Sequence, residues 1–343
     1  MVMQDGGTVD VRPGADPGRA APEHSGAYLA SGLCLALYGG ALLAWILYGI
    51  AQGNGTAWDF VEGLFNPGAS TGAQALGPYE WSFSVAFLAV AGLSLAQRRA
   101  ARSAALFCAL LLLAVSLREG VGLFHAAYRD QYSNDPLGGW ALATRGLGLV
   151  TALVVLALLL PAAERPARPR VAPAPDGPEA RWRRLSRVCG VLLLITAVIR
   201  VGWCVRDLTT GSTDIGRYLR GVVDGSVPGT LDLSASVEFT TVGSALALLV
   251  VGVIAIRGRR DIRGALLVFA AVELYLTVRT VVWLAVTDFF SLSSETPEGA
   301  LSMATTAYAL AAMTSVVVLA TGRGPGGYDG MRGPVGSRVP TSE

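Results

Sequence analysis

The feature that most constrains this chain is a run of about 20 apolar residues that recurs along its whole length. A run of this length forms a helix that crosses the hydrocarbon core of a bilayer. Only 15% of the residues are charged and the mean hydropathy is +0.50, whereas soluble domains carry about 25% charged residues. We predict an all-α, polytopic integral membrane protein with eight transmembrane helices, at about 30–51, 82–97, 103–125, 141–161, 188–206, 237–256, 264–287 and 300–321.

The second half of the sequence repeats charged residues of the first half at fixed intervals. Arg118 and Arg279 lie 161 residues apart, and the neighbouring arginines of both segments match at the same interval. Closer to the start of each half the interval is 158, as between Glu80 and Glu238. Charged matches at a constant interval arise by chance less often than matched leucines. We therefore predict two tandem four-helix repeats, which share one orientation because each contains an even number of spans.

These repeats set the expected division of the chain. Two long loops, 52–80 and 207–236, each contain apolar residues near helical spacing, which predicts one short interfacial helix in each loop. The expected segments are a disordered cytoplasmic tail at 1–28, a first membrane repeat at 29–162, a Pro/Arg-rich cytoplasmic linker at 163–186, a second membrane repeat at 187–322 and a second disordered cytoplasmic tail at 323–343.

The arginines predict the orientation. All 27 basic residues are arginine, and most of those outside the spans lie in the two tails, in the linker and in the loops near 98–102 and 257–263. The opposite loops contain only Arg129, Arg217 and Arg220. Because arginine is enriched on the cytoplasmic side, we expect a multi-pass protein of the cell membrane with both termini in the cytoplasm.

Several charged residues fall inside or at the ends of the apolar runs. A charged side chain inside a bilayer normally faces the bundle interior and has a partner. Helix rise places two repeated pairs at similar depth, and two further pairs occur once each. The expected ion pairs are Glu80–Arg118, Glu238–Arg279, Glu119–Arg145 and Glu273–Arg200. These pairs either hold helices together or belong to a binding site, and the sequence leaves both interpretations open.

Arginine exceeds glutamate within the spans, chiefly in their outer halves. If these side chains converge on a cavity, the matching ligand is an anion such as a lipid phosphate. The candidate anion-binding residues are Arg118, Arg279, Arg145 and Arg200.

The chain lacks a P-loop, the common hydrolase and zinc motifs, and any clustered His and Cys residues, so we expect no cofactor, no metal and no catalytic residues. The favoured interpretation is a non-enzymatic scaffold or regulatory component of a membrane complex. The alternatives are a binder or transporter of an anionic lipid-like molecule and, least favoured, an outer-face enzyme using Glu80 or Glu238. The expected partners are the lipid bilayer, an anionic lipid or another membrane protein, and no nucleic acid.

Overall fold

The computed structural model describes residues 18–52, 57–66, 78–162, 178–211, 214–227, 233, 236–258, 262–287 and 296–322. This part of the chain is helical apart from turns and one isolated bridge between Arg19 and Arg98. Its helices are η1 (Pro22–His24), α1 (Ser25–Gln52), α2 (Ala57–Phe65), α3 (Pro78–Leu95), α4 (Arg99–Gly122), α5 (Ala126–Asn134), α6 (Gly138–Leu159), α7 (Pro178–Thr210), α8 (Ile215–Val223), α9 (Val237–Ile256), α10 (Arg263–Val286) and α12 (Pro297–Thr321).

Seven of the described helices are long and apolar enough to cross a membrane, which is consistent with a multi-pass integral membrane protein. The apolar part of α3, Tyr79–Leu95, is shorter than these seven. Large apolar side chains cover the outside of the bundle, as at Leu37, Leu47 and Val198. Such a surface is expected against lipid and not against water.

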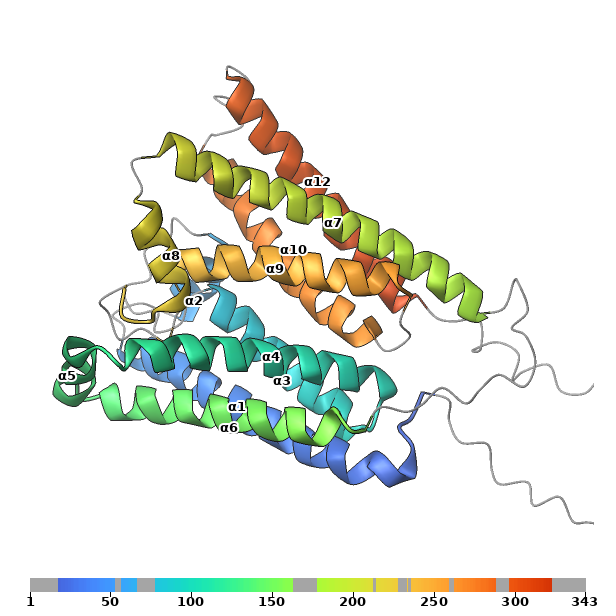
Figure 1. Ribbon diagram of the computed structural model, residues 1–343, viewed down its shortest axis with the longest axis horizontal. Coiled ribbons are helices and arrows are strands. Elements are labelled where there is room, and N and C mark those ends of the chain that lie inside the picture. Colours follow the sequence, from blue (N-terminus) through green and yellow to red (C-terminus); the bar gives the residue numbers. More distant parts are fainter. Residues whose placement is uncertain are drawn as a thin grey trace, which may run out of the picture.

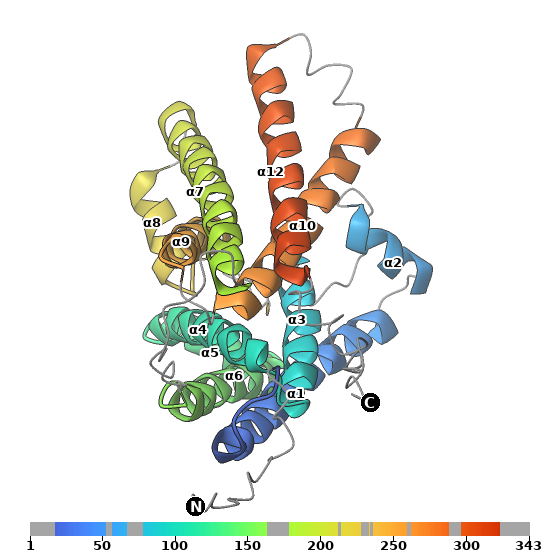
Figure 2. The ribbon, with the colours of Figure 1, turned by 90° about the vertical axis from the view of Figure 1, so that its right-hand side faces the viewer.

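The long helices form two groups, with α1, α3, α4 and α6 in one and α7, α9, α10 and α12 in the other (Figure 1). Helices α5 and α8 lie at one end of the bundle, which we call the α8 end. The described chain begins and ends at the opposite end, which we call the terminal end. Figure 2 shows α2 beside α10, where the Tyr275 hydroxyl donates to the carbonyl oxygen of Leu64 at 2.7 Å.

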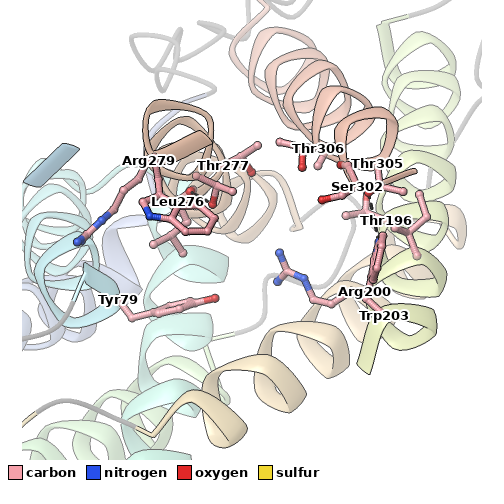
Figure 3. Close-up of a pocket in the computed structure, with 14 residues that line it drawn as sticks. Tyr79, Thr196, Arg200, Trp203, Leu276, Thr277, Arg279, Ser302, Thr305 and Thr306 are labelled. Carbon is pink, nitrogen blue, oxygen red and sulfur yellow. Dashed lines mark hydrogen bonds between the residues drawn. The ribbon is translucent and has the colours of Figure 1, made fainter. Parts of the chain in front are cut away.

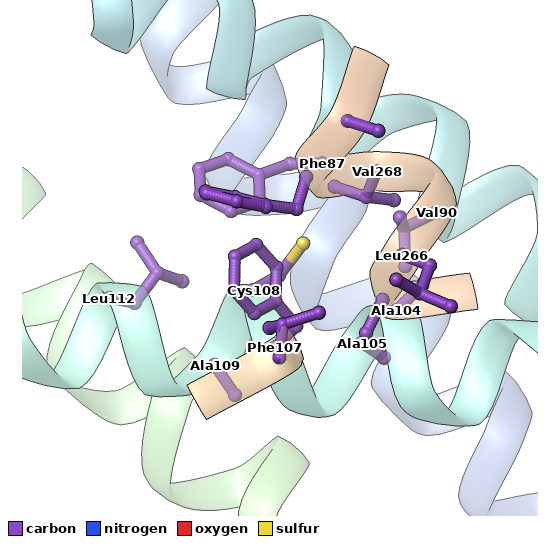
Figure 4. Close-up of a cluster of buried hydrophobic side chains, with 14 of the residues drawn as sticks. Phe87, Val90, Ala104, Ala105, Phe107, Cys108, Ala109, Leu112, Leu266 and Val268 are labelled. Carbon is purple, nitrogen blue, oxygen red and sulfur yellow. The ribbon is translucent and has the colours of Figure 1, made fainter. Parts of the chain in front are cut away.

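The two groups meet chiefly along α4 and α10. Small side chains on α4, including Ala104, Ala105 and Ala109, leave room for the side chains of α10 (Figure 4). Phe107 and Phe269 meet edge to face at 5.5 Å between ring centroids. Gly264 allows the closest approach, because a β-carbon there would overlap the carbonyl oxygen of Ala100.

Several contacts of the first group recur in the second. The indole of Trp45 donates to Thr144 at 2.9 Å, and that of Trp203 donates to Thr305 at 3.2 Å. These contacts join α1 to α6 and α7 to α12.

One arginine in the first turn of α4 and one in the first turn of α10 form matching hydrogen bonds. The Nε atom of Arg102 donates to the carbonyl oxygen of Leu159 at 3.0 Å, and that of Arg263 donates to Ala320 at 2.6 Å. Both bonds satisfy carbonyl groups at a helix C-terminus that lack an intrahelical partner.

The helix boundaries correct two expected segments. Helix α1 begins at Ser25, inside the expected tail 1–28, and α7 begins at Pro178, inside the expected linker 163–186. Proline at the start of α7 is favourable, because the first helical amide needs no intrahelical acceptor. Residues 1–17, 163–177 and 323–343 of these expected segments lie outside the described residues.

Candidate functional site

A cavity of about 530 Å³ lies between α7, α10 and α12, with Tyr79 of α3 at one side (Figure 3). Among the described residues, two arginines line it and no carboxylate does. Hydroxyl groups and two tryptophans make up much of the remaining wall. The lining residues are Tyr79, Thr196, Ile199, Arg200, Trp203, Leu276, Thr277, Arg279, Thr280, Trp283, Ser302, Thr305, Thr306 and Ala309.

Helical spacing explains why these side chains share one space. Helix α7 contributes Thr196, Arg200 and Trp203, which lie three or four residues apart and therefore on one helix face. Helix α12 contributes residues 302, 305, 306 and 309, and α10 contributes 276, 277, 280 and 283, with the same spacing. The lining residues of the three helices thus share one space, which opens toward the outside of the bundle at Thr280 and Trp283.

Arg200 is held at the cavity wall by a two-point ion pair. Its Nη1 and Nη2 atoms donate to the two carboxylate oxygens of Glu273, at 3.0 and 2.7 Å. Nη1 also donates to the Ser244 hydroxyl at 2.6 Å. Glu273 is only 2% exposed, so its charge is compensated by these fixed donors and not by water. Figure 3 shows the Tyr79 hydroxyl pointing toward Arg200.

Arg279 lines the same cavity, but its guanidinium group is turned away from Arg200 (Figure 3). The expected pair with Glu238 is not formed within the described residues. Glu238 is in the first turn of α9 and faces α8, where its carboxyl carbon would be 3.4 Å from a β-carbon at Gly221.

Arg118, the sequence equivalent of Arg279, lies outside this cavity and is 3% exposed. It pairs with Glu119 at 3.2 Å and not with Glu80. Its Nε atom donates to the carbonyl oxygen of Gly221 at 3.2 Å, and its guanidinium lies over the Phe239 ring. The turn after α8 covers this end of α4, so Arg118 finds its partners there.

Glu119 joins Arg118 to a second arginine. The Nη2 atom of Arg145 lies 3.8 Å from Glu119 and donates to the carbonyl oxygen of Leu233 at 2.8 Å. The Tyr128 hydroxyl of α5 donates to the other carboxylate oxygen at 3.0 Å. This buried network joins α4, α5, α6 and α8. Its burial and its contacts between four helices favour a role in holding the α8 end together.

Asp224, directly after α8, anchors that turn. It accepts hydrogen bonds from the amide and hydroxyl of Ser226, at 2.9 and 2.7 Å, and lies 3.0 Å from His125. Burial alone would raise the pKa of Asp224. The bonds from Ser226 and the contact with His125 outweigh this effect and hold its pKa below the ordinary value of 3.8.

The hydroxyl wall of the cavity was not predicted from the sequence. Threonine and serine recur at helical spacing in 277–280 and 302–306, Thr196 lies four residues before Arg200, and this spacing was the available signal. Glu80, the remaining candidate, lies in the first turn of α3, where its charge acts on Tyr38. No group of three or more His, Cys, Asp or Glu residues that could hold a metal ion occurs in the described part of the chain.

No protein-family model matches this chain, and neither does any curated protein or any solved structure.

Proposed function

We propose that this membrane protein binds the polar headgroup of an anionic, lipid-like molecule in the cavity between α7, α10 and α12. The observation that carries the proposal is the composition of the cavity wall, which joins two arginines to hydroxyl groups and contains no carboxylate. Glu273 neutralises Arg200, so Arg279 supplies the surplus positive charge. Arginine is well suited to phosphate because its planar fork offers paired donors.

A two-repeat architecture underlies the proposal. We infer that 29–162 and 187–322 are tandem copies of a four-helix unit. Support comes from the indole bonds of Trp45 and Trp203 and from the arginine bonds that end α6 and α12, which recur at the intervals seen in the sequence. Further support is that two equivalent positions contact each other. The Ser103 hydroxyl accepts a hydrogen bond from the amide of Gly264, which lies 161 residues further along the chain.

In the first repeat, a larger residue stands at one position equivalent to the cavity wall and a smaller one faces it. Tyr38 occupies the position of Thr196, and Gly148 occupies that of Ala309. A β-carbon at Gly148 would lie 3.0 Å from the Tyr38 ring, so this tyrosine fills the equivalent space. The second repeat has a threonine in place of this tyrosine and contains a polar cavity. Close packing of the helices alone would not require this difference.

We also propose that α3 is an eighth span. Its 18 residues extend about 27 Å, close to the thickness of the hydrocarbon core. The turn after α3 bonds to the segment before η1, where the amide of Ala20 donates to the carbonyl oxygen of Gln97 at 2.8 Å. Eight spans and the distribution of arginine together favour cytoplasmic termini in the cell membrane, with the α8 end outside.

Native mass spectrometry of the gently purified protein tests the binding proposal. The variant T196Y/A309G installs the residue pair of the first repeat and fills the cavity with packing that the chain already uses. V198Y is the matched control, because Val198 is 68% exposed on the same helix. We expect an anionic lipid on the wild type and on V198Y, and its loss from T196Y/A309G.

Equal lipid retention in all three proteins would overturn the proposal. A protein partner that co-purifies with all three, in the absence of a specific lipid, would favour the scaffold instead.

A further inference from the structure

The cavity threonines already use their hydroxyl protons. Thr196, Thr277 and Thr280 donate to the carbonyl oxygens of Leu192, Glu273 and Leu276, at 2.9, 2.7 and 3.0 Å. A hydroxyl group has one proton to donate and two lone pairs that accept. These three side chains therefore offer the cavity acceptors, and a ligand matches them only if it brings donors of its own.

The cavity also offers donors to the same ligand. The ion pair with Glu273 and the bond to Ser244 leave the Nε–H and one Nη2 proton of Arg200 without a partner among the described residues. Ser302 and Thr306 form no side-chain hydrogen bond within the same ranges, so they both donate and accept. The wall thus combines acceptors with donors, and hydroxyl groups of a ligand satisfy both.

Charge restricts the ligand further. An ammonium headgroup would find no carboxylate in the lining, because Glu273 is engaged by Arg200 behind the wall. One surplus arginine, Arg279, matches one negative charge. A phosphodiester carries one negative charge, whereas a phosphomonoester carries about 1.5 to 2 at pH 7. A simple alkyl phosphodiester has the matching charge but offers no donors to the threonine oxygens, so it matches the wall less well.

We infer that the ligand of this cavity is a polyol phosphodiester, with a phosphate that carries one charge and an attached group rich in hydroxyls. Such chemistry occurs in phosphatidylglycerol-type lipids and in their soluble headgroups. The phosphate lies toward Arg279, and the hydroxyl groups lie against Thr196, Thr277 and Arg200. This inference rests on the proposed function of the cavity and specifies its ligand.

The test compares two lipids that differ only in headgroup hydroxyls. Phosphatidylglycerol and phosphatidylpropanol with identical chains are added to the delipidated wild-type protein, and bound lipid is counted by native mass spectrometry. We expect the wild type to prefer phosphatidylglycerol by about tenfold, the effect of one to two hydrogen bonds. The variant T196V/T277V should bind both lipids about equally. T314V is the matched control, because Thr314 makes the same backbone bond on an exposed face of α12.

Each outcome supports or overturns a separate claim. Equal binding of both lipids to the wild type, abolished by T196Y/A309G, overturns the polyol inference and leaves the cavity as an anion site. Binding that T196Y/A309G does not affect, or no binding of either lipid, overturns the proposed function and the inference with it. Competition by soluble glycerophosphoglycerol identifies the headgroup alone as sufficient, and its failure to compete identifies the intact lipid as the ligand.

Discussion

At the scale of single residues, buried charge in this protein is matched in two different ways. Glu119 is shared by two arginines and a tyrosine in a buried network, whereas Glu273 holds one arginine at the edge of a cavity. The buried network lies away from the cavity and joins helices. An arginine held at a cavity wall, with two N–H groups still available, can also bind a ligand. The pair of Arg200 and Glu273 therefore links the stability of the bundle to its proposed site.

The Arg200–Glu273 pair gives a sharp stability prediction. R200L and E273L each leave one buried charge without its partner, and each should lower the free energy of unfolding by about 3 kcal/mol. The double variant should lose less than the sum of the two, because no uncompensated charge remains. Thermal unfolding in mild detergent measures all four proteins. Additive losses would show that the two side chains do not interact.

At the scale of elements, apolar periodicity predicted most long helices to within a few residues. The expected spans 237–256 and 300–321 correspond to α9 (Val237–Ile256) and α12 (Pro297–Thr321), whose first turns are capped by Ser236 and Thr296. Short helices were also expected in both long loops, where α2 and α8 lie. Apolar residues at helical spacing mark the helix face that packs against lipid or against the core, so they locate helices of this kind.

Polar elements and side-chain partners could not be predicted in this way. Helix α5 was missed because its sequence is polar and its one buried residue, Tyr128, sets up no apolar stripe. The partner of Arg118 could not be predicted, because sequence spacing gives the depth of a residue along its helix but not which neighbouring element it faces. Arg118 faces α8, where it donates to the carbonyl oxygen of Gly221. The cavity followed from tilts of α7, α10 and α12, which depend on packing between segments far apart in sequence.

The contact between α4 and α10 depends on the absence of one side chain. G264A should destabilise the protein by about 1–3 kcal/mol, because the added methyl group forces the two backbones apart at Ala100. G146A is the matched control, since no atom lies within 4 Å of a β-carbon at that position in α6. Thermal unfolding should separate the two variants. Because alanine favours the helix more than glycine does, G146A should keep or raise the stability, and a loss in G146A as large as that in G264A would show that the effect does not come from the contact with Ala100.

At the scale of the whole molecule, the two proposed repeats share a frame and differ in one cavity. If they are structural equivalents, W45F and W203F should each lower the free energy of unfolding by about 0.6 kcal/mol, the usual contribution of a hydrogen bond between membrane helices. Only W203F should also weaken lipid binding, because Trp203 lines the cavity. Thermal unfolding and native mass spectrometry check the two parts separately, and a binding loss in W45F would count against the proposed division of roles.

The number of crossings decides where the two ends of the chain lie. With eight spans, residues 19 and 322 are on one side of the membrane, and α8 is on the other. With the seven longer helices alone, residues 19 and 322 are on opposite sides. Single cysteines at Arg19, Arg217 and Gly322, all exposed, distinguish these arrangements with a membrane-impermeant maleimide applied to intact cells and then to broken ones.

We expect R217C to react in intact cells, and R19C and G322C to react only after the membrane is broken. The wild type is the control for background, because Cys108 and Cys189 are buried and Cys34 and Cys204 lie within long helices. If R19C and G322C react from different sides, α3 does not cross. The reactivity of R217C would then show on which side of the membrane the α8 end lies, because Arg217 is part of α8.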